Sequence, residues 1–282
     1  GISYAPLSDE TVHEWMYYLK TLDVLEQVDY CGWRSIADYM SLLDRRMAQN
    51  AIAQVPYANV RTLAMGWSRG VPDDTQIRHM QHEIRLAMDQ GATGVSTGLD
   101  YVNQCFATTD ELAEVCSVLQ PYGGIYVTHV RYKKGTLNGI REAVEIGRRA
   151  HCPVHISHLK GATAEEIDEI LTYIDRVAIH EVDFSYDAYP YMPGSTMLNY
   201  FLPYEVWENG PTGVLNKLGL PSTRRKLRAF FESVHAPQLD KVYFAWVASQ
   251  SNRSWQGKTL AEYVDSTGQD VADAICNLLI DE

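Results

Sequence analysis

Residues 154–177 read VHISHLKGATAEEIDEILTYIDRV. A short apolar run with two histidines, Val154–His158, comes first, and Thr163 with Glu166 then gives the pattern of a helix-capping box. Apolar residues follow at helical spacing, at Ile167, Ile170, Leu171, Ile174 and Val177. The stretch therefore predicts one strand followed by one helix.

The same unit recurs along the chain. Apolar runs occupy residues 60–65, 93–97, 125–129, 154–158 and 182–187. Candidate helix starts lie between them, at Asp73/Asp74, Thr108–Asp110, Thr136 and Thr163. Repeated strand–helix units of about 30 residues predict right-handed crossovers and a parallel sheet. No GxGxxG pattern follows any run, so five units in a row favour a (β/α) barrel over a doubly wound sheet.

The runs account for part of a barrel, which needs eight strands. Residues 1–58 are predicted to be a helical lead-in, with helical spacing from Ile36 to Leu43. Residues 59–199 carry the five strand–helix units, and residues 200–282 do not continue the rhythm. We expect this last segment to be a helical insertion in one incomplete barrel.

Composition excludes several classes of protein. The 282 residues include 24 Lys and Arg against 36 Asp and Glu, a net charge of −12 without a basic run, which argues against nucleic-acid binding. No apolar stretch approaches the length of a membrane span. The five cysteines are odd in number and form no CxxC pair, which excludes a disulfide framework and favours a cytoplasmic location.

Two of the runs end in a histidine, His129 and His158. Neutral imidazoles that converge from neighbouring strands suit a divalent metal such as zinc. Each could instead be a structural histidine, but their equivalent positions, each followed two residues later by a cation, favour the metal. His155 lies three residues before His158, so the two side chains should point to opposite faces of the strand. We expect His155 to be a core or helix-facing residue.

Further polar residues follow the strand ends. Lys160 and Arg131 could clamp an anionic group such as a carboxylate, or form only a solvated rim. Tyr189 and Ser195 follow the last run and could present hydroxyls to a ligand, although a plain loop with packed aromatics would look the same. Tyr101 closes the segment that follows the run at 93–97.

Four segments carry a resemblance to a known family. They are STGLDY (96–101), THVR (128–131), SHLK (157–160) and YPYMPGST (189–196). In sequence, order and spacing they resemble the N-acyl-D-amino-acid deacylases, or D-aminoacylases, of the amidohydrolase superfamily. The resemblance implies a metal-dependent (β/α)₈ barrel joined to a small β-sandwich. It also implies hydrolysis of the linear amide of an N-acyl-D-amino acid to a D-amino acid and a carboxylate, with zinc as cofactor.

The resemblance also implies residue roles. His129 and His158 would be zinc ligands on strands five and six, and Lys160, Tyr189 and Ser195 would contact the substrate. Arg131 and Tyr101 match motif positions and join the expected substrate-binding set.

Three features of the family have no counterpart in this sequence: an HxH pair on strand one, a metal-bound cysteine on strand two and a catalytic aspartate on strand eight. The segment Gly1–Pro6 resembles the stretch that follows the strand-two cysteine. The five runs then correspond to strands three to seven. We expect a fragment, truncated at both ends, which holds no general base and is inactive by itself.

Two other functions stay open. A cyclic-amide hydrolase of the dihydroorotase or hydantoinase kind would usually carry a carboxylated lysine at the end of strand four, where this chain has Ser96 and Thr97. A non-catalytic barrel that binds metabolites is the second alternative. In either case the expected partner is a small molecule, with neither nucleic acid nor membrane, and the oligomeric state is left open.

Overall fold

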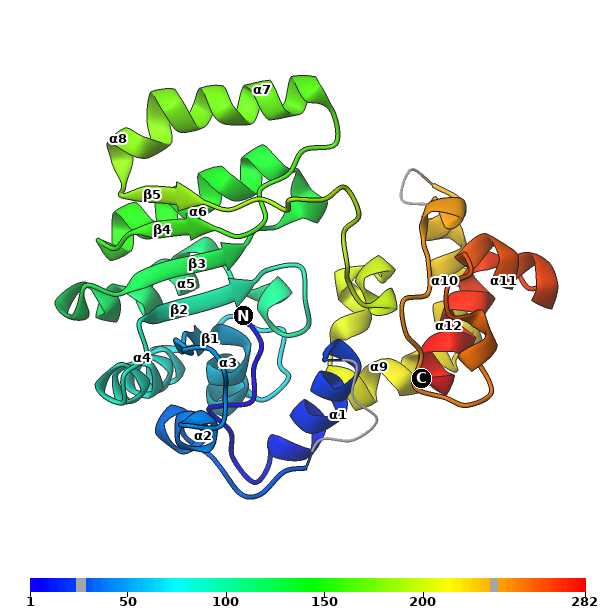
Figure 1. Ribbon diagram of the computed structural model, residues 1–282, viewed down its shortest axis with the longest axis horizontal. Helices are drawn as coiled ribbons and strands as arrows, with labels where there is room; N and C mark the ends of the chain where they lie inside the picture. The colour runs from blue at the N-terminus through cyan, green and yellow to red at the C-terminus, as the bar shows by residue number, and fades with distance from the viewer. Residues whose placement is uncertain (24–28, 234–237) are drawn as a thin grey trace. The chain divides into compact units, whose positions relative to one another are not determined.

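The computed structural model describes residues 1–23, 29–233 and 238–282. The chain divides into two compact units (Figure 1). Unit 1 comprises Gly1–His13 and Tyr30–Pro193, and unit 2 comprises Glu14–Asp29 and Gly194–Glu282. In the part of the chain that the structure describes, no helix is both long and apolar enough to cross a membrane.

Unit 1 is built on a parallel sheet. Its described strands are β1 (Val55–Pro56), β2 (Gly94–Gly98), β3 (Ile125–His129), β4 (Val154–Ile156) and β5 (Phe184–Tyr186), hydrogen-bonded in that order (Figure 1). Consecutive order is that of a barrel wall, whereas a doubly wound sheet reverses its order part-way. The predicted α/β class with parallel strands is confirmed.

Helices connect these strands and pack against one another in chain order, α3 on α4, α4 on α5, α5 on α6 and α6 on α7. Right-handed crossovers between consecutive strands place such helices on the same face of the sheet. The helices of unit 1 are α2 (Ile36–Leu43), α3 (Tyr57–Met65), α4 (Asp74–Asp89), α5 (Thr109–Cys116), α6 (Thr136–Ala150), α7 (Ala164–Tyr173) and α8 (Ile179–Glu181).

Capping residues explain where two of these helices begin. The Asp73 carboxylate accepts hydrogen bonds from the amides of Thr75 and Gln76, both at 2.9 Å, and opens α4 with a complete capping box. Thr163 caps α7 by accepting from the Glu166 amide at 3.2 Å. The Glu166 carboxylate accepts from Ala162 instead, so the capping box predicted there is only half formed.

One predicted strand is wrong. Residues 60–65 lie in helix α3, and the first strand, β1, is the two-residue segment that precedes it. The run VRTLAM is short and apolar, and such a run is equally compatible with a strand and with a buried helix. Every residue from Tyr57 to Thr62 is buried, so α3 has no polar face that its sequence could reveal.

The two faces of the sheet differ. Val95, Tyr126 and Val154 lie in register under the helices, and each is 0% exposed. The neighbouring row, which includes Val127 and His155 in register, faces the other way and is only partly buried. The expectation that His155 faces the core or the helices is therefore wrong, because Val154 and Ile156 occupy the helix-facing positions of β4.

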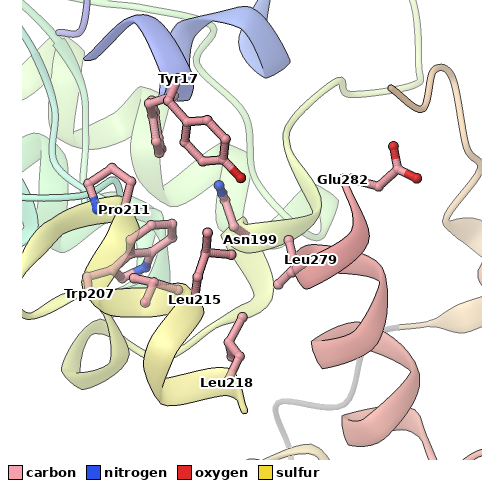
Figure 2. A pocket seen from close by; sticks show the side chains of 10 residues that line it. Tyr17, Asn199, Trp207, Pro211, Leu215, Leu218, Leu279 and Glu282 are labelled. Carbon is pink, nitrogen blue, oxygen red and sulfur yellow. The ribbon is translucent and has the colours of Figure 1, made fainter. Parts of the chain in front are cut away.

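Unit 2 is helical. Its helices are α1 (Val12–Leu22) from Glu14 on, α9 (Gly210–Leu218), α10 (Pro221–Phe231), α11 (Leu260–Thr267) and α12 (Val271–Asp281). Ion pairs join α10 to the start of α12, where Arg228 contacts both Asp270 and Asp273. A largely apolar pocket of about 80 Å³ lies beside Trp207 and Leu215 (Figure 2). Its apolar lining matches that of a small packing gap, so we assign it no function.

Candidate metal and substrate site

The two predicted metal ligands meet at the carboxyl edge of the sheet. His129 is the last residue of β3, and His158 follows the neighbouring strand β4 by two residues. Nδ1 of His129 lies 3.2 Å from Nε2 of His158. The strand-end positions thus bring the two rings together, as expected for parallel neighbouring strands.

A turn after β4 aims His158 toward His129. The strand ends at Ile156, and His158 has a left-handed backbone with φ of 43°. Its amide donates a hydrogen bond to the Asp187 carboxylate, whose Oδ2 lies 3.0 Å from Nε2 of His155. Side chains alternate between the two faces only within a strand, and His158 lies beyond the end of β4. The alternation that predicted opposite directions for His155 and His158 therefore does not apply to His158.

The outer nitrogen of each imidazole also has a polar partner. Nε2 of His129 lies 3.3 Å from Oδ2 of Asp100, which is fully buried. Nδ1 of His158 lies 3.2 Å from the Tyr132 hydroxyl oxygen. Asp100 and Tyr132 are site residues that the sequence motifs do not single out. Their only signal is position, because each follows a strand end by two or three residues.

The surroundings keep both imidazoles neutral near pH 7. Burial lowers the pKa of His129, although the neighbouring Asp100 carboxylate opposes the shift. Burial, together with the nearby His129 and Lys160, lowers the pKa of His158 to about 4. Neutral imidazole is the form that binds a metal ion.

The spacing of the two rings fits a zinc ion. With Zn–N bonds of about 2.0–2.1 Å and tetrahedral angles, two ligand nitrogens stand about 3.3 Å apart. The facing nitrogens of His129 and His158 are 3.2 Å apart. Among the described residues, no group of three or more His, Cys, Asp or Glu side chains is arranged to hold a metal. The pair therefore supplies part of a coordination sphere.

Three of the expected substrate residues surround the histidines. Nζ of Lys160 lies 4.2 Å from the centre of the Tyr132 ring. The Tyr189 ring centre is 5.5 Å from that of His158, and the Tyr101 ring centre is 4.9 Å from that of His129. Ser195 belongs to unit 2, and its role stays a prediction.

Arg131 does not fit the role expected of it. It is 4% exposed, and its Nε lies 2.9 Å from a carboxylate oxygen of Glu142. The terminal guanidinium nitrogens donate to the backbone carbonyls of Cys105 and Ala107. Because each guanidinium nitrogen has such a contact and the side chain is buried, Arg131 anchors the loop after β2 and is not placed to clamp a substrate.

Known proteins are similar to this chain in sequence and in fold. No protein-family model matches the chain. D-aminoacylase of Alcaligenes xylosoxydans xylosoxydans is 36% identical over 203 residues, which are 70% of this chain and 40% of the relative. The chain is a homologue of the N-acyl-D-amino-acid deacylases. N-acyl-D-aspartate deacylase of the same organism is 32% identical over 204 residues.

A solved deacylase structure extends the match to almost the whole chain. The crystal structure of a D-aminoacylase, described as defining a novel subset of amidohydrolases, covers 98% of this chain at 26% identity with a TM-score of 0.69. The match takes up 51% of that protein. The chain thus spans about two fifths to a half of the length of the deacylases that it matches.

Proposed function

We propose that this chain carries part of the metal and substrate site of a metal-dependent hydrolase of N-acyl-D-amino acids, which releases a D-amino acid and a carboxylate. The facing nitrogens of His129 and His158, 3.2 Å apart beside Lys160, are the observation that carries the proposal. Homology to proteins named D-aminoacylase and N-acyl-D-aspartate deacylase supports it.

The two histidines would hold a zinc ion through Nδ1 of His129 and Nε2 of His158. When bound, zinc lowers the pKa of a water molecule to near 7 and polarises the amide carbonyl. A catalytic zinc normally has three protein ligands, so the pair accounts for two of them. We assign no general base among the described residues.

Four further residues would bind the substrate. Lys160 is exposed at the rim of the site, where its ammonium group can pair with the carboxylate of the amino-acid part. The Tyr189 and Tyr101 rings would form walls beside the two imidazoles. Ser195 would add a hydroxyl donor to the same ligand.

A reducing, cytoplasmic compartment is part of the proposal. The five cysteines all lie in described residues, and each of them is a free thiol. Four are buried, which suits an interior that never forms disulfides. Stable disulfides are rare in the cytosol, so this usage favours that location.

The cyclic-amide alternative finds less support. An enzyme of that kind usually carries a carboxylated lysine at the end of the corresponding strand, and strand β2 (GVSTG) contains no lysine. The non-catalytic alternative would keep the same pocket and bind metabolites without turnover.

Zinc titration of the 282-residue chain by calorimetry tests the metal site. We expect one zinc per chain, and we expect His129→Ala and His158→Ala each to abolish binding. His79→Ala is the matched control, because His79 contacts Glu83 at 3.6 Å on the exposed side of α4. Equal zinc binding by all three variants would refute the metal site.

Binding of substrates by the zinc-loaded chain tests the class of reaction. We expect an N-acetyl-D-amino acid to bind more tightly than its L enantiomer and than a cyclic dihydropyrimidine. Preference for the cyclic amide, or binding of none of the three, would contradict the proposed function.

A further inference from the structure

The short distance between His129 and His158 has two possible chemical meanings. If one facing nitrogen carries a proton, the 3.2 Å separation is a hydrogen bond between the rings. If neither does, two lone pairs face each other, and only a cation between them is favourable. A neutral imidazole carries a single proton, so the partner of each outer nitrogen decides between these states.

The partner of His129 is an acceptor. Oδ2 of Asp100 lies 3.3 Å from Nε2 of His129, and a carboxylate can only accept a hydrogen bond. Asp100 is fully buried, so bulk water does not compete for its carboxylate. The ring proton of His129 therefore belongs on Nε2, which leaves the lone pair on Nδ1, the nitrogen that faces His158.

The partner of His158 is a hydroxyl whose own proton is already used. The Tyr132 oxygen lies 3.0 Å from the backbone carbonyls of both Ser157 and His158, which can only accept. Its proton goes to these carbonyls, so the oxygen accepts from Nδ1 of His158 at 3.2 Å. The lone pair of His158 then lies on Nε2, the nitrogen that faces His129.

We propose that Asp100 and Tyr132 are positioning residues that fix the tautomer of each imidazole, so that the metal-free protein already presents two lone pairs to one cation. The proposal rests on the proposed function only for the identity of that cation. Such outer partners commonly orient metal-binding histidines, and their loss costs about 10–100-fold in metal affinity.

The test is ¹⁵N NMR of the metal-free chain labelled at its histidines, with signals assigned from the His129→Ala and His158→Ala spectra. Long-range ¹H–¹⁵N couplings report which nitrogen of each ring carries the proton. We expect His129 as the Nε2–H tautomer and His158 as the Nδ1–H tautomer. His158 is the decisive residue, since Nδ1–H is the minor form of a free imidazole in water.

Variants extend the test to metal affinity. Tyr132→Phe should move His158 toward the Nε2–H form and weaken zinc binding about 10–100-fold. Asp100→Asn keeps an oxygen acceptor and should bind zinc more tightly than Asp100→Ala. Tyr126→Phe is the matched control, since this buried tyrosine of β3 contacts Thr97 at 3.0 Å on the helix-covered face and should change neither tautomers nor affinity.

The outcomes separate the two proposals. An Nε2–H tautomer for His158 in the unmodified chain, or an unchanged tautomer in Tyr132→Phe, would overturn the inference. The expected tautomers without any zinc binding would uphold the positioning role and overturn the proposed metal site. The first measurement needs only the unmodified chain and the two histidine variants used for assignment, so the inference remains falsifiable even if Asp100→Ala does not fold.

Discussion

Arg61 and Glu111 form an ion pair from which water is excluded. Nε of Arg61 lies 2.7 Å from Oε1 of Glu111, and neither side chain is more than 1% exposed. The other guanidinium nitrogens donate to the carbonyls of Ser68 and Gly70, both at 2.7 Å. One side chain of α3 thus fixes both helix α5 and the loop that leads to α4.

Arg61→Met should lower the free energy of unfolding by about 3–5 kcal/mol, because it leaves the Glu111 carboxylate buried without its cation. Urea unfolding measures the loss. The control is Arg149→Met, whose partner Asp110 lies 2.6 Å away in a pair that is 38% and 84% exposed. Such a surface pair is worth about 0–1 kcal/mol, and equal losses in the two variants would contradict the prediction.

Gly94→Ala tests the close approach of strands β2 and β3. A Cβ at Gly94 would lie 2.0 Å from the carbonyl oxygen of Ile125, and backbone cannot move aside as a flexible side chain can. We expect a loss of about 1–3 kcal/mol in thermal or urea unfolding. Gly194→Ala meets nothing within 4 Å and should leave stability unchanged. Wild-type stability of Gly94→Ala would show that β2 and β3 are farther apart.

Lys160→Ala tests carboxylate recognition by the zinc-loaded chain. A charge-assisted hydrogen bond is worth about 1.5–3 kcal/mol, so the dissociation constant of an N-acyl-D-amino acid should rise at least about tenfold. Its carboxamide analogue should bind as before. Lys258, whose Nζ lies 4.6 Å from the centre of the Trp255 ring, provides a matched Lys→Ala control. If Lys160→Ala weakened binding of the acid and of the carboxamide equally, Lys160 would not recognise the carboxylate and would be only a charge at the rim of the site.

We expect the stability of unit 2 to fall in acid because of Asp270. Burial alone would raise the pKa of Asp270, but Arg228 and the side chain and amide of Asp273 lower it to about 2, below the ordinary 3.8. Because the folded pKa is depressed, the stabilisation is complete above about pH 4 and is lost as the pH falls toward 2. Asp270→Asn keeps the helix cap, so the stability difference from wild type should shrink between pH 6 and pH 3. A difference that does not change with pH would refute this.

Sequence patterns located strands wherever burial alternates or flanking turns are clear. The run 125–129 matches β3 residue for residue, because Ile125, Val127 and His129 face one side while Tyr126 and Thr128 are buried on the other. The positions of His129 and His158 at the ends of neighbouring strands also predicted that their rings would meet. The strand-like pattern failed at helix α3. Its residues 57–62 are all buried, so the sequence there has no polar–apolar period that would distinguish a helix from a strand.

The features of the site that the sequence did not indicate depend on contacts distant in sequence. Arg131 binds carbonyls 24 and 26 residues away, at Ala107 and Cys105, and no local pattern signals such partners. His158 owes its direction to a left-handed turn that a histidine adopts rarely. Asp100 contacts His129 because the register of β2 and β3 places Gly98 opposite His129, and no local sequence pattern shows that register.

The consecutive order of the strands bears on how this sheet assembles. From β2 to β5, each strand pairs with residues about 30 positions away, as Val127 does with His155 and His155 with Ser185. The entropy lost on closing such loops depends weakly on their length and is nearly the same at every step. Each new strand therefore pairs with the strand that precedes it in the chain, whose edge is already in place. The sheet can grow in the order in which the chain is synthesised.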